Sequence, residues 1–102
     1  MHLFKQIVES LKFYHPEKII LFGSYARGKP AKDSEIDLLV IKSTKKDHYR
    51  RIPEVRAYLH HLDKAFDILV MTPKEINKRL KLGDFFIEDI IKKGKILYEK
   101  KS

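Results

Sequence analysis

The segment IILFGSYARGKPAKDSEIDLLV, residues 19–40, decides the fold predicted for this chain. Its apolar start predicts a buried strand over 18–22, which Gly23 and Ser24 turn into a short helix. A basic loop follows, and a second apolar run predicts a strand over 36–41. About a dozen residues separate the two strands, and an antiparallel return is the simplest connection of that length.

Two carboxylates stand at the start of the second strand, Glu35 and Asp37. Side chains two residues apart point to the same face of a strand, so this pair should project together beside the Gly-Ser turn. Carboxylates held that close repel each other unless a cation or a proton lies between them. Mg²⁺ takes oxygen ligands and is commonly shared with substrate phosphates, so the pair indicates a magnesium site.

A third aspartate is expected at the same place. Residues 65–71 predict a strand, and the long helical segment before it favours a parallel crossover from the second strand. Asp67 then lies at the same end of the sheet as Glu35 and Asp37, on the matching face. We therefore expect three carboxylates to converge next to the Gly-Ser turn.

The other elements follow from the helical spacing of apolar residues and from cap signals. Thr72, Pro73 and Glu75 supply the N-cap, the first-turn proline and the capping-box glutamate of one helix. The expected helices are 2–14, 47–62, 73–83 and 84–93, and a short edge strand is expected over 96–98. The last helix should bury Phe86, Ile87, Ile90 and Ile91. The chain is predicted to form one domain over 1–102, of the α/β (α+β) class, with a small mixed sheet and helices mainly on one face.

The spacing Gly23-Ser24, ten residues, then Glu35-x-Asp37 resembles the G-S-x(10)-D-x-D signature of the nucleotidyltransferase superfamily. The segments GSYARG and SEIDLLV are most similar to those of the minimal nucleotidyltransferases (MNT proteins) of the DNA polymerase beta-like group. Many of these are antitoxin partners of HEPN-domain toxins. The resemblance implies a small nucleotidyltransferase fold over most of the chain.

The resemblance also implies a reaction. Glu35, Asp37 and Asp67 would be the catalytic carboxylates and the ligands of two Mg²⁺ ions that clamp an in-line phosphoryl displacement. The substrate would be ATP, whose AMP would be transferred to a hydroxyl, with a tyrosine of a HEPN partner protein as the expected acceptor.

The Gly-Ser turn supplies the phosphate-binding residues in this interpretation. Backbone N–H groups at Gly23 and Ser24, together with the Ser24 hydroxyl, would hold the terminal phosphates of the nucleotide. Arg27 would either neutralise phosphate charge or pair with a motif carboxylate.

The sequence departs from the family pattern at one position, because Glu35 stands where the motif has an aspartate. This leaves an alternative of another class, an antitoxin that neutralises its toxin by contact and has a weakened active site. A third hypothesis is a basic RNA-binding domain, which is disfavoured because the aromatic residues are not interleaved with the basic ones.

Composition sets the remaining bounds. The 102 residues carry a formal net charge of +8, which favours phosphate-bearing or acidic partners. Cysteine is absent and no run of about 18 apolar residues occurs, so we expect a cytoplasmic protein without a membrane span. Charged residues make up 35% of the chain and the only amide residues are Gln6 and Asn77, a pattern typical of thermophile proteins. The basic segment 42–56 is expected to be a solvated face, with contact to a partner or RNA as the alternative.

Overall fold

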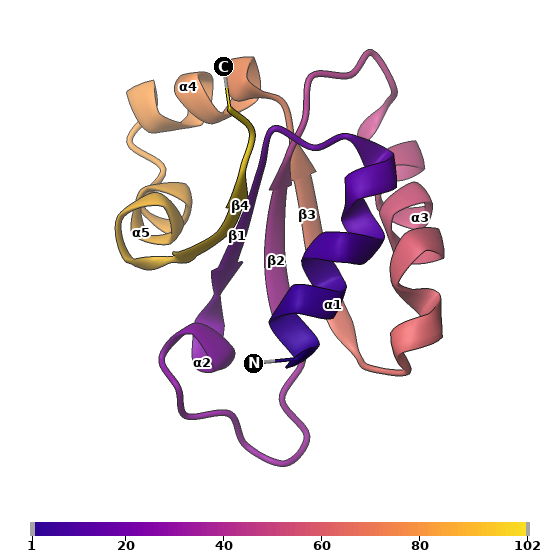
Figure 1. The fold of residues 1–102 in the computed structure, drawn as a ribbon. Coiled ribbons are helices and arrows are strands. Elements are labelled where there is room, and N and C mark those ends of the chain that lie inside the picture. The colour runs from indigo at the N-terminus through magenta and orange to yellow at the C-terminus, as the bar shows by residue number, and fades with distance from the viewer. Residues whose placement is uncertain (1, 102) are drawn as a thin grey trace.

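The structure, a computed structural model, describes residues 2–101 and contains one four-stranded mixed sheet. The strands are β1 (Lys18–Phe22), β2 (Ile36–Ile41), β3 (Phe66–Met71) and β4 (Lys95–Glu99), in the order β3-β2-β1-β4 (Figure 1). β1 is antiparallel to β2 and to β4, whereas β2 and β3 are parallel. The predicted α/β class, mixed sheet and strand directions are therefore confirmed.

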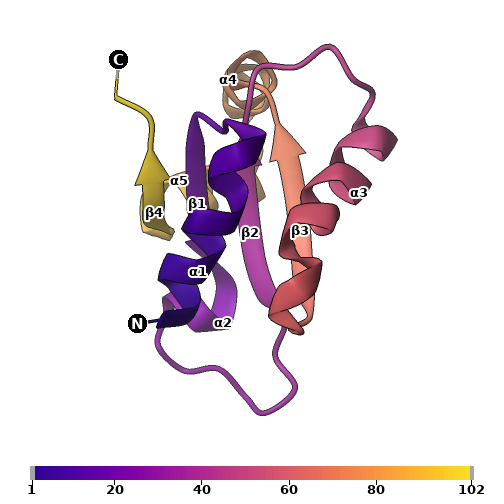
Figure 2. The ribbon, with the colours of Figure 1, turned by 45° about the vertical axis from the view of Figure 1, so that its right-hand side comes forward.

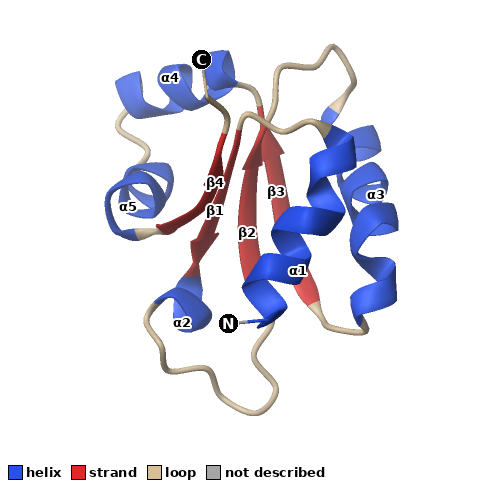
Figure 3. Ribbon diagram, viewed as in Figure 1, coloured by secondary structure: helices blue, strands red, loops and turns tan. Residues whose placement is uncertain are grey.

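Helices cover both faces of the sheet, so the expectation of helices mainly on one face is wrong. α1 (His2–Leu11) and α3 (His48–Leu59) lie on one face, and α4 (Pro73–Lys81) and α5 (Phe85–Lys93) lie on the other (Figures 1 and 3). A view turned by 45° shows α1 and α3 in front of the sheet and α5 behind it (Figure 2). α2 (Gly23–Ala26) is a single short turn at the end of β1.

The core is correspondingly divided by the sheet into two clusters. The alternation of strand side chains sends Leu38 and Val40 to the α1/α3 side and Leu39 and Ile41 to the α4/α5 side. Because both faces of β1 and β2 are apolar, each face needs its own helical cover. Among residues 2–101, no helix combines the length and apolarity needed to cross a membrane.

Cap residues set the helix starts on the α4/α5 side. Thr72 accepts a hydrogen bond from the Glu75 backbone N–H, and the Glu75 carboxylate accepts one from the Thr72 N–H, which completes the predicted capping box. Asp84 caps α5 by accepting from the Phe86 and Ile87 N–H groups.

In α5 only Ile87 and Ile90 are buried. Phe86 and Ile91 are 56% and 38% exposed, so the prediction that they are core residues is wrong.

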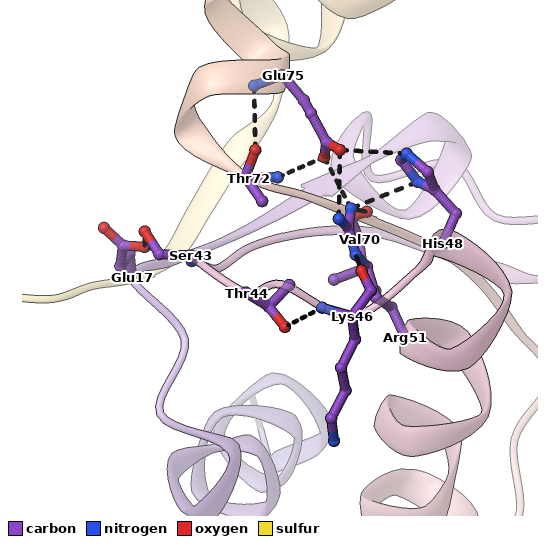
Figure 4. Close-up of polar contacts among 9 residues, drawn as sticks. All are labelled: Glu17, Ser43, Thr44, Lys46, His48, Arg51, Val70, Thr72 and Glu75. Carbon is purple, nitrogen blue, oxygen red and sulfur yellow. Dashed lines mark hydrogen bonds and ion pairs between the residues drawn. The ribbon is translucent and has the colours of Figure 1, made fainter.

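A buried arginine joins α3 to the start of α4 (Figure 4). Arg51 is only 5% exposed and donates to both carboxylate oxygens of Glu75, at 2.7 and 3.2 Å. It also donates to the Lys46 and Val70 carbonyls, and His48 lies within 3.2 Å of the same carboxylate. The basic segment is therefore not uniformly a solvated face, because Arg51 holds two elements together.

Candidate active site

Two of the predicted carboxylates lie side by side on adjacent strands. Asp37 of β2 and Asp67 of β3 are direct partners in the parallel register. Neighbouring strands lie about 4.8 Å apart, and both side chains belong to the face that carries Leu39 and Leu69. This is the α4/α5 face, at the end of the sheet where β2 and β3 begin.

Gly23 brings the turn after β1 into contact with Asp37. Phe22 pairs with Asp37 in the antiparallel register, and Gly23 follows with φ of 74°. A Cβ atom at Gly23 would lie 2.0 Å from Asp37 Oδ2. Both the positive φ and this contact require glycine here, so the turn backbone and the carboxylate form one unit.

The surroundings of Asp37 disfavour its charged form. Burial raises the pKa of Asp37, and the nearby charges of Asp67 and Glu35 raise the pKa further, while the Arg27 guanidinium partly offsets them. Glu35 itself is exposed and directly precedes β2. The three carboxylates thus interact electrostatically at one end of the sheet, and a bound cation would relieve their repulsion.

The donor set suits a cation that keeps an open coordination sphere. Between residues 2 and 101 no group of three or more His, Asp or Glu side chains is arranged so that it could hold a metal ion, so at most two carboxylates would bind one directly. Mg²⁺ commonly takes only one or two carboxylates from a protein and fills its octahedron with water and substrate phosphate oxygens. Asp37 and Asp67, with Glu35 nearby, fit that mode of binding.

The remaining predicted residues lie at the same end. Ser24 is half-buried in α2, and Arg27 follows α2 as an exposed side chain. In the part of the chain that the structure describes, Arg27 forms no salt bridge, so its guanidinium is available to an anion. The loop from α2 to β2 passes below this end of the sheet (Figure 1).

A cavity beside Asp37 adds residues that the sequence did not indicate. It has a volume of about 290 Å³ and lies between α2 and α5. Its walls include Asp37 and Arg27 on one side and Phe86, Asp89 and Lys93 on the other. These α5 residues were missed because helical spacing predicts Phe86 as core. The spacing of Phe86, Asp89 and Lys93 at i, i+3 and i+7 places them on one face of the helix, and this pattern could have indicated the cavity wall.

Comparison with known proteins agrees with this geometry. A family model described as polymerase beta, nucleotidyltransferase matches residues 5–102. A relative from Methanocaldococcus jannaschii, MJ0604, is 30% identical over 97 residues, which span 92% of this chain and 93% of the relative. Its name provisionally assigns it as a protein adenylyltransferase.

Solved structures show the same fold. A chain of a toxin–antitoxin crystal structure with AMP-PNP is 24% identical and aligns with a TM-score of 0.67, covering 96% of this chain and 74% of that chain. A chain of a mutant form of the toxin–antitoxin MntA-HpeT is 25% identical with a TM-score of 0.63, covering 95% of this chain and 72% of that chain. The match over nearly the whole sequence and the shared architecture establish that this chain belongs to the polymerase beta nucleotidyltransferase family.

Proposed function

We propose that this chain transfers AMP from ATP to a hydroxyl group of a partner protein, in a reaction that depends on Mg²⁺. The observation that carries the proposal is the pairing of Asp37 with Asp67 on one face, with Gly23 pressed against Asp37. The relative named as a protein adenylyltransferase supports both the reaction and a protein acceptor.

The Gly23-Ser24 turn and Arg27 bind the phosphates of ATP in this proposal. The turn leaves no side chain between its backbone and Asp37, so phosphate oxygens can approach the carboxylate closely. Arg27 supplies a positive charge at the same end of the sheet. Asp37 and Asp67 would hold Mg²⁺, with Glu35 nearby, and the bound ion would neutralise the negative charge that develops on the phosphate oxygens.

Asp67 is the residue placed to assist the acceptor. It is exposed at the start of β3, which is the outermost strand on that side of the sheet. A hydroxyl approaching over β3 would pass its proton to Asp67 while its oxygen bonds to the α-phosphorus. The bond from that phosphorus to the bridging oxygen breaks, and pyrophosphate leaves.

The acceptor is proposed to be a tyrosine of a HEPN-type partner. A protein side chain is the expected source of the acceptor hydroxyl, because the relative MJ0604 is named as a protein adenylyltransferase. The similarity to chains of toxin–antitoxin structures supports a protein partner of this kind.

Label transfer tests the proposal. The purified chain is incubated with Mg²⁺, a HEPN-type protein and ATP labelled at either the α- or the γ-phosphate. The expected result is α-label on the partner, no γ-label, and loss of the signal with Asp37→Asn. Inhibition of the partner without label on it would instead establish a binding module.

A further inference from the structure

The cavity between α2 and α5 has the chemistry of a nucleotide pocket. Phe22 and Phe86 contact each other edge to face, with ring centroids 5.8 Å apart and planes at 83°. Both rings line the cavity, as do the cations Arg27 and Lys93 and the carboxylates Asp37 and Asp89. Aromatic surface next to two positive charges complements a base joined to phosphates.

The position of the cavity relative to the two aspartates separates donor from acceptor. In the strand order β3-β2-β1-β4, Asp67 lies on one side of Asp37 and the cavity lies on the other, against Gly23 and Gly94. The Gly-Ser turn is on the cavity side. A triphosphate at that turn therefore has the cavity beside it, while the Asp67 side stays open for an acceptor.

The volume of the cavity and the weak ion pair of Lys93 both favour a small ligand. A volume of about 290 Å³ is close to the lower limit of about 300 Å³ for small-molecule pockets, which suits a nucleoside. Within residues 2–101, the one ion pair of Lys93 is with Asp89, at 3.2 Å, and both side chains are exposed to solvent. Such pairs contribute little, so Lys93 can turn toward a phosphate at small cost.

We propose that this cavity binds the nucleoside of the donor ATP, with Phe86 contacting the base and Lys93 contacting the phosphates. The assignment rests on the proposed function, and it adds a helix that lies outside the Gly-Ser and carboxylate motif. α5 thereby becomes the element that holds the donor against Asp37.

The chain offers a matched control for each residue. Phe85 is 82% exposed and precedes Phe86 but does not line the cavity, and Lys92 stands in the same relation to Lys93. Calorimetric titration with Mg²⁺ and adenylyl imidodiphosphate is compared with titration with Mg²⁺ and tripolyphosphate, which has no base. Melting curves establish that each variant is folded.

Phe86→Ala is expected to weaken binding of the nucleotide analogue about tenfold, which is the size of one lost aromatic–base contact. It should leave the binding of tripolyphosphate unchanged. Lys93→Ala should weaken binding of both probes several-fold, because a charge-assisted contact to the phosphates is lost. Phe85→Ala and Lys92→Ala should bind both probes like the unsubstituted chain.

The outcomes separate this assignment from the proposed function. If Phe86→Ala binds the analogue normally while Asp37→Asn loses it, the cavity assignment is overturned and the proposed function stands. If the expected pattern appears but no α-label reaches a partner, the cavity assignment is supported and the proposed transfer fails. Absence of analogue binding by the unsubstituted chain overturns both.

Discussion

Replacing Glu75 by glutamine should destabilise the fold through the loss of one negative charge. The hydrogen bonds from Arg51, the largest influence, together with the Thr72 backbone N–H and the charges of Arg51 and His48, lower the pKa of Glu75 from 4.5 to about 2 (Figure 4). Each pKa unit is worth about 1.4 kcal/mol, so this shift corresponds to about 3 kcal/mol. Solvent reaches 30% of the Glu75 side chain and screens part of the interaction, which leaves about 2 kcal/mol.

The sign of the pH dependence follows from the direction of the shift. A carboxylate whose pKa is depressed in the folded state contributes its stability above its ordinary value of 4.5 and loses it as the pH falls toward about 2. The difference in unfolding free energy between the two proteins should therefore be about 2 kcal/mol at pH 7, equivalent to about 10 °C in Tm, and should shrink as the pH falls below 4.5.

Urea denaturation of both proteins at a series of pH values measures this difference. Glutamine keeps an acceptor for the Thr72 N–H, so the helix cap is retained and the charge is the main change. Glu88→Gln is the control, because Glu88 forms an exposed pair with Lys92 at 3.5 Å and its replacement should change stability by less than about 0.5 kcal/mol. A loss from Glu75→Gln that is equal at pH 7 and pH 3.5 would refute the electrostatic reasoning.

Four further predictions concern backbone contacts and the active site. Gly94→Ala should cost about 2 to 3 kcal/mol of unfolding free energy in urea titrations, because its Cβ would lie 2.4 Å from Ile20 Cγ2. Gly28→Ala, where the added Cβ meets open space, should cost only about 1 kcal/mol from its positive φ. Gly23→Ala should lower AMP transfer about 100-fold in the label assay, since its Cβ displaces the Asp37 carboxylate. The raised pKa of Asp37 in the metal-free chain implies that Mg²⁺ binding weakens on acidification at a higher pH than an ordinary aspartate would give, and calorimetric titration with Mg²⁺ at a series of pH values measures this.

Local patterns in the sequence were sufficient to predict the strands and their directions. A nearly continuous apolar run identified β2 with its observed bounds, Ile36–Ile41, and the connection lengths gave the antiparallel and parallel pairings. The Thr72 capping box was also predictable, because all its partners lie within one helical turn. The same reasoning placed Asp37 and Asp67 on one face, as the structure has them.

Features that depend on distant partners were not predictable in this way. Arg51 belongs to a basic segment and looks solvated, yet its partner Glu75 is 24 residues away and only the packed α3 and α4 bring them together. Phe86 has the spacing of a core residue, but it lies at the edge of the α5 interface beside Phe22 and lines a cavity. Which face of the sheet each helix covers is likewise decided by packing of the whole chain.

The central claim is that Asp37 and Asp67 together hold Mg²⁺ with ATP. Calorimetric titration with adenylyl imidodiphosphate, with and without Mg²⁺, tests it most directly in the unsubstituted chain and in Asp37→Asn and Asp67→Asn. Mg²⁺ is expected to strengthen binding of the nucleotide analogue at least about tenfold in the unsubstituted chain, and either substitution is expected to abolish this gain while the fold is kept. An equal gain from Mg²⁺ in all three proteins, or none in the unsubstituted chain, would contradict the account.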